Sequence, residues 1–366
     1  MDFFHSQLLV DKFVPPKFHR FHLDDIHLDK LTDKKWMYSC CGKASLYHCL
    51  KSLNISRKIL IPVYICDSIM SVIQKMRLMP IFYDLNMEDL NASFEDIVYK
   101  FENNDNVEAV LVASMYGNPA NLYRIQQFCR EKNLKMIDDA AQSFGAKIGE
   151  QFVGTFGDAG FFSFSPGKPT AGHLGSFFWT SNEKYFVKYK NHFFFHLIAY
   201  LDFYFNRYKV YSYKKFRVFN VFYYLDIFFK TKLDWYDDKM NCFEDKILGG
   251  ILHDNFSQTY RAEILRIISN SLRDNNMIRV ITKGDAGTNN HKLVVIAYSK
   301  KIAVEIFAYF KELRIFVSYG YTPLDTKSNT SNAMTLNGKI LEIPIEDNKD
   351  KFNVILNALV YLTSKK

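Results

Sequence analysis

The side chains best suited to chemistry lie in one stretch, MIDDAAQSFGAKIGEQFVGTFGDAGFFSFSPGK, near the middle of the 366-residue chain. It carries two adjacent carboxylates, an amide, a hydroxyl and an amine: Asp138, Asp139, Gln142, Ser163 and Lys168. Lys168 stands in a Ser-Pro-Gly-Lys-Pro loop between two aromatic, strand-like runs. A lysine in a turn is usually only a solvated charge. The residues that precede this one make it a candidate for catalysis.

These residue types are the ones that hold and use pyridoxal 5'-phosphate. A lysine amine forms a Schiff base with the aldehyde of this cofactor. A carboxylate keeps the pyridine nitrogen protonated, so that the ring can accept electrons. A hydroxyl and the N-terminus of a helix hold the phosphate, and an amide can hydrogen-bond the ring oxygen. The stretch therefore predicts a pyridoxal phosphate site.

Residues 57–180 alternate between strand and helix patterns, which would position these side chains. Strands are predicted in KILIPVYI, MPIFYDL, VEAVLVASMYG and KMIDDAA, and helices in SIMSVIQKM, FEDIVYKFE and NLYRIQQFCREKN. This alternation favours a mainly parallel sheet with helices on both faces. Ligands of such sheets bind beyond the carboxyl ends of the strands, where Tyr116 and the pair Asp138 and Asp139 would lie.

A glycine-led helix further upstream offers another part of such a site. In SCCGKASLYHCLKSL, Gly42 precedes an amphipathic helix whose apolar side carries Ala44, Leu46, Leu50 and Leu53. The start of a helix has free backbone N–H groups and a positive dipole end, which suit a phosphate. Most turns of this kind only cap a helix, so both interpretations stay open from these residues alone.

The last third of the chain returns to a mixed pattern. HKLVVIAYS, RIFVSYG and KILEIPI are typical of strands, and IAVEIFAYFKEL and FNVILNALVYLTSKK of helices. A chain of this length exceeds one typical hydrophobic core. We therefore predict a large α/β domain in residues 1–240 and a smaller C-terminal α+β domain in residues 241–366.

Composition narrows the class of protein. With 48% hydrophobic and 23% charged residues, the chain is typical of a globular fold. The six cysteines form no CxxC pair and no metal-ligand spacing with histidine, which favours free thiols in a reducing compartment and no metal site. We find no secretory signal and no membrane-spanning run, and expect a cytoplasmic protein. The net charge of +8 suits phosphorylated substrates or an anionic membrane; nucleic acid is disfavoured because no motif for it is found.

The stretch around Lys168 resembles the DegT/DnrJ/StrS family of sugar aminotransferases, which use pyridoxal phosphate. The matching segments are IDDAAQSFGA, VGTFGDAGFFSFSPGK and the glycines of GHLGS, with weaker matches in CGKASLYHCLKSL, ILIPVYIC, PIFYDL, MYGNPANLYRI, LRIFVSYGYTPL and LEIPI. The resemblance covers residues 36–183 well and 290–366 loosely. It implies a fold like that of type I aminotransferases, with a mainly parallel sheet in the large domain, and it implies a homodimer.

The resemblance also implies roles for individual residues. Lys168 matches the catalytic lysine that forms the Schiff base and moves the substrate proton. Asp139 matches the carboxylate at the pyridine nitrogen. The further cofactor ligands that it implies, beside the ring oxygen and around the phosphate, are Gln142, Ser163, Gly42, Lys43 and Asn241 of the partner subunit. We expect His173 and Tyr321 to lie near the substrate, and Asp138 to be a structural carboxylate.

The reaction that the resemblance implies is transfer of an amino group, usually from glutamate, to a nucleotide-linked keto sugar. Such sugars serve surface polysaccharide or related glycan biosynthesis. Family members that remove a hydroxyl instead carry histidine at the position of Lys168, so the lysine favours transamination. A sugar dehydratase and a catalytically silent cofactor-binding relative are the alternatives.

Residues 184–236 form a segment that is rich in aromatic, lysine and arginine residues and poor in acids. We call it the aromatic/basic segment. It could fill the core or a dimer interface, stack against a sugar, or rest on an anionic membrane with its aromatics at headgroup level. The last alternative would make the enzyme peripheral at the inner face of the membrane.

Overall fold

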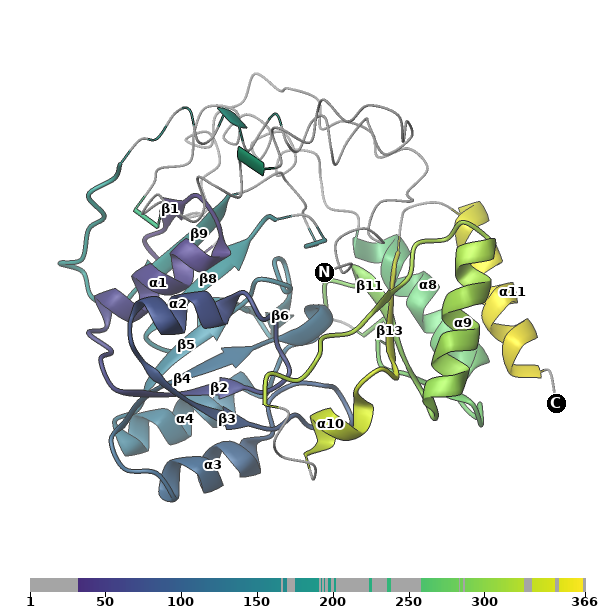
Figure 1. The fold of residues 1–366 in the computed structure, drawn as a ribbon, viewed down its shortest axis with the longest axis horizontal. Helices are drawn as coiled ribbons and strands as arrows, with labels where there is room; N and C mark the ends of the chain where they lie inside the picture. Colours follow the sequence, from purple (N-terminus) through teal and green to yellow (C-terminus); the bar gives the residue numbers. More distant parts are fainter. Residues whose placement is uncertain are drawn as a thin grey trace.

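The computed structural model describes most of the chain outside the aromatic/basic segment. The described residues are 32–165, 167–169, 175–190, 192, 194, 197–198, 201, 224–225, 236–237, 258–282, 284–285, 287–325, 331–345 and 349–364. Two α/β bodies lie side by side, the first ending after strand β9 (Ser176–Thr180) and the second starting with helix α8 (Gln258–Ser271) (Figure 1). The domain boundary predicted between residues 240 and 241 lies outside the described residues and stays a prediction.

The first body is built on a seven-stranded sheet in the order β1-β9-β8-β5-β4-β2-β3. Its other strands are β1 (Met37–Ser39), β2 (Lys58–Pro62), β3 (Met79–Tyr83), β4 (Val107–Ala113), β5 (Lys135–Asp139) and β8 (Ala159–Ser163). The strands from β3 to β8 in this order pair in parallel, and β9 and β1 add an antiparallel edge. The predicted mainly parallel sheet is confirmed.

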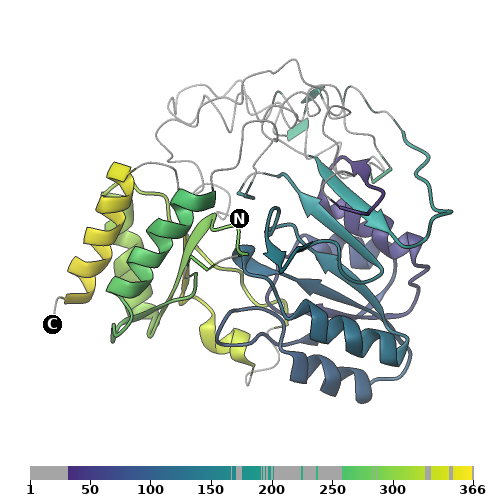
Figure 2. The same cartoon turned by 180° about the vertical axis from the view of Figure 1, so that it is seen from behind.

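Helices cover both faces of this sheet, as predicted. On β4, Leu111 packs into the core that includes α1 (Gly42–Ser52) and α2 (Ile69–Lys75). Its neighbour Val110 packs on the opposite face with α3 (Phe94–Glu102) and α4 (Leu122–Lys132), which lie together at one side of the sheet in Figure 2. Because both faces are buried, the strands have near-continuous apolar sequences.

The second body has a four-stranded antiparallel sheet in the order β10-β11-β13-β12. Its elements are β10 (Ile278–Val280), β11 (Lys292–Ala297), β12 (Ser318–Tyr319), β13 (Ile340–Pro344), α8, α9 (Lys300–Glu312), α10 (Asn332–Leu336) and α11 (Lys349–Ser364). Leu293 and Val295 pack in one core with residues of α8, α9 and α11, while Val294 and Ile296 join the core of the first body. Both faces of this sheet are therefore buried.

One predicted strand of the last third is much shorter than its pattern indicated. RIFVSYG predicts a strand over 314–320, but β12 covers only Ser318–Tyr319. Arg314 has a φ of +56° and closes α9: its N–H bonds to Lys311 and that of Ile315 bonds to Phe310. This αL ending takes up the residues before β12. Helix α8 and strand β10 were not predicted. Strands β11 and β13 and helices α9 and α11 lie where the sequence patterns predicted them.

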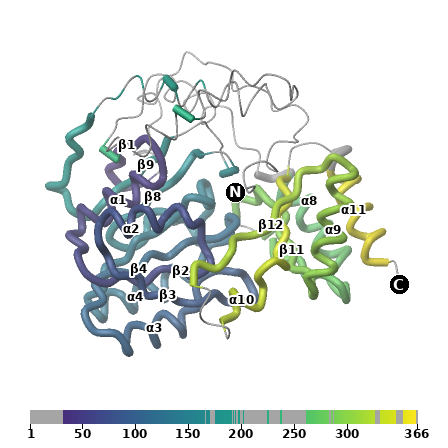
Figure 3. The backbone as a smooth tube through the Cα atoms, viewed as in Figure 1, coloured from purple at the N-terminus to yellow at the C-terminus, as the bar shows by residue number. Residues whose placement is uncertain are grey.

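Hydrogen bonds join the two bodies along the carboxyl edge of the large sheet. The N–H of Leu324 donates to the carbonyl of Val63 at 2.8 Å, and Asn289 Nδ2 donates to the carbonyl of Gln142 at 2.7 Å. The described residues that follow β12, 320–325, run along this edge (Figure 3). Among the described residues, no helix is both long enough and apolar enough to cross a bilayer.

Candidate active site

Asp139 and Lys168 come together at the carboxyl edge of the large sheet. Asp139 is the last residue of β5, is 6% exposed, and its Oδ1 accepts a 2.9 Å hydrogen bond from the N–H of Ala141. Burial raises the pKa of Asp139 to about 6, and the N–H of Ala141 and the charge of Lys168 oppose that rise. A carboxylate buried in this way favours a positively charged partner.

Lys168 follows β8 in a turn in which its N–H bonds to the carbonyl of Ser165 at 3.2 Å. The residue is half-buried, yet burial of its amine lowers the pKa of Lys168. The acidic groups of Cys66 and Asp139 oppose that lowering, as does Glu342 more weakly, and the positive charge of Lys292 adds to it. A lowered pKa leaves more of the amine neutral, which is the form that attacks a carbonyl carbon.

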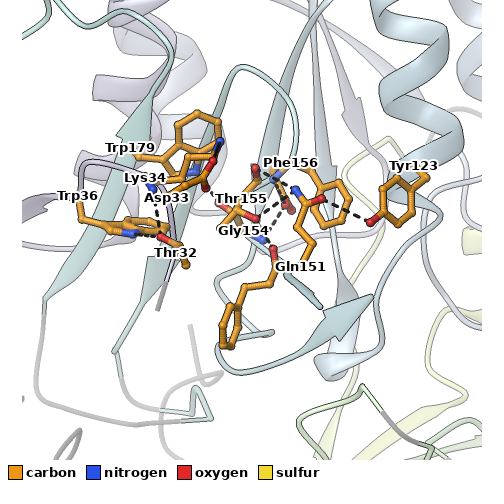
Figure 4. Close-up of polar contacts among 12 residues, drawn as sticks. Thr32, Asp33, Lys34, Trp36, Tyr123, Gln151, Gly154, Thr155, Phe156 and Trp179 are labelled. Carbon is orange, nitrogen blue, oxygen red and sulfur yellow. Dashed lines mark hydrogen bonds and ion pairs between the residues drawn. The ribbon is translucent and has the colours of Figure 1, made fainter. Parts of the chain in front are cut away.

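The contacts of Asp138 are those of a structural carboxylate, as expected. It is fully buried, and its Oδ2 accepts from the N–H groups of Gly154 at 2.6 Å and Phe156 at 3.1 Å. Trp179 donates from Nε1 to the carbonyl of Gly154 at 2.6 Å, so the turn is held from both sides (Figure 4). Burial raises the pKa of Asp138 to about 7, and Oδ1 has no hydrogen-bond partner among the described residues.

The start of α1 lies against the end of β8. A Cβ built on Gly42 would stand 3.0 Å from the Oγ of Ser163, so these two residues from distant parts of the chain are neighbours. The N-terminus of α1 already stabilises a negative charge. Although burial opposes ionisation of the Cys41 thiol, the side chain of Cys40, the charge of Lys43 and the first-turn amides lower the pKa of Cys41 to about 7. This environment suits a phosphate.

Gln142 forms hydrogen bonds with two tyrosines at the carboxyl edge of the large sheet. Its Oε1 accepts from the N–H of Tyr116 at 3.2 Å, and its Nε2 donates to the hydroxyl of Tyr321 at 3.1 Å. Tyr116 has a φ of +58°, which is unfavourable for a tyrosine and is typical of functional sites. The structure thus brings the predicted residues Gln142 and Tyr321 into contact. Their roles toward a ligand stay predictions.

Two predicted site residues, His173 and Asn241, lie outside the described residues. Three residues that the sequence did not single out lie close to the others: Tyr64, Lys292 and Glu342. The only signal for the last two is a charge within or at the end of an otherwise apolar strand, HKLVVIA and LEIPI. Since a buried strand face normally excludes charge, that signal could have marked both residues.

The residues that meet here fit pyridoxal phosphate. An amine whose pKa burial lowers and a buried carboxylate interact electrostatically, and the start of a helix suited to an anion lies beside a serine hydroxyl. An amide side chain reaches the same edge. Groups of metal-ligating side chains that could hold an ion are absent from the described part of the chain.

Comparison with known proteins gives matches to a family of aminotransferases. Residues 33–195 match the family model described as the DegT/DnrJ/EryC1/StrS aminotransferase family. The chain is 32% identical over 125 residues to GDP-perosamine synthase of Escherichia coli O157:H7, which is 34% of each chain. It is 28% identical over 137 residues to GDP-perosamine synthase of Vibrio cholerae, 37% of each chain. The aligned part thus spans about a third of these curated relatives.

Solved structures extend the likeness over the whole chain. PseC of Helicobacter pylori, described as an aminotransferase involved in the biosynthesis of pseudoaminic acid, superposes with a TM-score of 0.69 at 14% sequence identity and full coverage of both chains. At this identity the likeness establishes a shared fold.

Proposed function

We propose that this chain belongs to the DegT/DnrJ/EryC1/StrS aminotransferase family, whose model matches residues 33–195, and that it is a pyridoxal phosphate-dependent transaminase. It transfers an amino group, with glutamate as the expected donor, to a nucleotide-linked keto sugar for surface polysaccharide or related glycan biosynthesis. The observation that carries the proposal is the electrostatic interaction between Lys168 and Asp139, which follow neighbouring parallel strands at the carboxyl edge of the sheet.

Each residue of the site has a proposed task. Bound pyridoxal phosphate supplies an aldehyde and a ring that withdraws electrons from the substrate carbon. Lys168 would hold the cofactor through its amine and would move a proton at the substrate carbon. Asp139 holds a proton at the pyridine nitrogen, which its buried carboxylate favours because the pair is then charge-balanced.

The remaining residues of the proposed site bind and orient the cofactor and the substrate. Gln142 would hydrogen-bond the ring oxygen of the cofactor, and the start of α1 together with Ser163 would hold its phosphate. Two further assignments of the proposal concern residues outside the described ones: His173 is assigned to the substrate, and Asn241 to the phosphate bound by the partner subunit. The proposed ligand set is thus Gly42, Lys43, Gln142, Ser163 and Asn241, with His173 and Tyr321 on the substrate side.

The identity of the acceptor rests on similarity and charge. The family model matches residues 33–195, the part that carries Lys168 and Asp139, and the names of the GDP-perosamine synthases similar to the chain specify a GDP-linked sugar. A net charge of +8 also suits a substrate with a diphosphate.

An absorbance spectrum of the purified protein with pyridoxal phosphate tests the proposal. We expect a visible band that glutamate bleaches, and no such band for Lys168→Ala. Lys132→Ala, at the exposed end of α4, is the matched control and should behave as the native protein. A protein that binds no cofactor, or binds it identically without Lys168, would contradict the proposal.

Product analysis separates transamination from dehydration. A nucleotide-linked keto sugar offered with glutamate should gain nitrogen, and an amine should replace the ketone. Loss of a ring hydroxyl without net nitrogen gain would instead identify a sugar dehydratase. A silent relative would bind the cofactor and change neither substrate.

The assembly and location are further parts of the proposal. The protein forms a cytoplasmic homodimer, and the aromatic/basic segment gives it a peripheral contact with anionic membranes. A mass from analytical ultracentrifugation that matches one chain would exclude the dimer. Failure to sediment with anionic vesicles at low salt would exclude the membrane contact.

A further inference from the structure

Lys292 and Glu342 lie on the buried face of the second sheet that packs against the large body. On β11 and β13, Lys292 pairs with Pro344, two residues from Glu342, so the two charged residues are diagonal neighbours on one face of the sheet. Three apolar residues of this face, Val294, Ile296 and Ile340, belong to the core of the first body. Lys292 Nζ donates to Glu342 Oε2 at 2.7 Å, with side chains only 14% and 7% exposed.

A chain of hydrogen bonds links this ion pair to the large sheet. Tyr116 donates from its hydroxyl to Glu342 Oε1 at 2.8 Å. Because Tyr116 has given its one hydrogen to Glu342, the 2.6 Å contact with Tyr64 must have Tyr64 as donor. The hydroxyl of Tyr64 in turn accepts from the N–H of Tyr321 at 3.2 Å. The carboxylate of Glu342 is thus fixed by two donors from two different bodies.

A buried ion pair of this kind is not explained by stability. Removing two charges from water costs more than a well-packed apolar pair would, so burial of Lys292 and Glu342 calls for another reason. The neighbours supply one, because Lys168 interacts electrostatically with both members of the pair. The titratable groups that face the Lys168 amine come from both bodies: Cys66, Asp139, His291, Lys292 and Glu342.

We propose that Lys292 and Glu342 are positioning residues for Lys168: the second sheet holds one positive and one negative charge at the edge of the large sheet where Lys168 lies, and their balance controls how readily the amine reacts. Lys292 alone would hold the amine in its neutral form, and Glu342 alone would hold it protonated. The bond from Tyr116 and the strand register keep both charges in place. This inference rests on the proposed role of Lys168.

The test measures the reactivity of Lys168 in the cofactor-free full chain. Trace acetic anhydride is added at a series of pH values, and acetylation of Lys168 is quantified by peptide mass spectrometry, with exposed Lys132 as internal reference. We expect the apparent pKa of Lys168 to rise in Lys292→Met and to fall in Glu342→Gln, each on the order of one pH unit. The double variant should return close to the native value.

Opposite shifts distinguish an electrostatic role from a structural one, because loosened packing would move both single variants in the same direction. Lys292→Arg keeps the charge and should stay near the native profile. If a single variant fails to fold, the other one and the double variant still carry the test. Shifts of one sign, or none, would overturn the inference. Since no cofactor is used, a protein that shows the opposite shifts but binds no pyridoxal phosphate would contradict only the proposed function.

Discussion

Gly42, the first residue of α1, lies so close to Ser163, the last residue of β8, that a Cβ on Gly42 would stand 3.0 Å from both Cβ and Oγ of Ser163. Contacts this short force a neighbour to move. The absence of a side chain at Gly42 therefore lets the start of the helix and the end of the strand lie this close together. The proposed phosphate site is made of these two ends.

Gly42→Ala should weaken pyridoxal phosphate binding by roughly tenfold, because the added methyl group separates α1 from Ser163 and overpacked contacts cost about 1–3 kcal/mol. The dissociation constant would be measured by titrating the cofactor-free protein and following fluorescence. Gly149→Ala is the control: Gly149 has open space around it and a φ of +60°, so its replacement should lower stability and leave affinity unchanged. Equal affinity in the native protein and Gly42→Ala would remove this residue from the phosphate site.

Asp139→Asn should keep the visible absorbance band and lose transamination by on the order of 100-fold or more, the size of effect expected when a preorganised charge is removed. Asparagine can still accept the hydrogen bond from Ala141, so the local backbone should persist. The measurement is the rate at which glutamate bleaches the band in a single turnover. A rate within a few-fold of the native one would show that another group holds the proton.

Asp138 should make the folded protein less stable as pH rises. Burial raises its pKa to about 7, so between about pH 4 and pH 7 the folded state holds a proton that the unfolded state has released. Stability therefore falls through this range, by up to roughly 4 kcal/mol if the raised pKa acts fully. Asp138→Asn should remove that part of the slope in urea unfolding at pH 4.5 to 7.5. An unchanged slope would mean that Asp138 is ionised without cost.

His48 should make the attachment of the aromatic/basic segment sensitive to acid. Its Nε2 donates to the carbonyl of Tyr236 at 2.9 Å, so its Nδ1 must accept from the hydroxyl of Tyr185 at 2.8 Å. Burial lowers the pKa of His48 to about 4. The folded state therefore binds fewer protons than the unfolded state, and stability is lost as pH falls from about 6.5 toward 4.

Hydrogen exchange of the amides of residues 185–190 would measure this effect. We expect faster exchange as pH falls through that window, after correction for the intrinsic pH dependence of exchange. In His48→Gln the exchange should be fast already at neutral pH and show no acid step. The amides of α4, which pack on the other face of the sheet, are the reference. Identical protection in the native protein and the variant would exclude His48 as an anchor.

Local sequence was sufficient for elements whose own residues specify them. FEDIVYKFE predicts a helix over 94–102, and α3 has these bounds, because Ser93 caps it through Asp96 and its apolar residues recur at helical spacing. Asp138 and Asp139 were expected at a strand end and lie there. The pattern failed at RIFVSYG, where the αL ending of α9 at Arg314 depends on a backbone conformation that no side-chain period reveals.

The sequence by itself determined the parallel sheet, the order of its elements and the stretch that carries Lys168 and Asp139, because periodicity and spacing are local properties of the chain. Only the tertiary structure decided that Lys292 and Glu342 pair on one sheet face and reach Tyr116 on another body. That contact depends on strand register and on how two sheets meet. Both follow from burial summed over the whole molecule, which no single segment encodes.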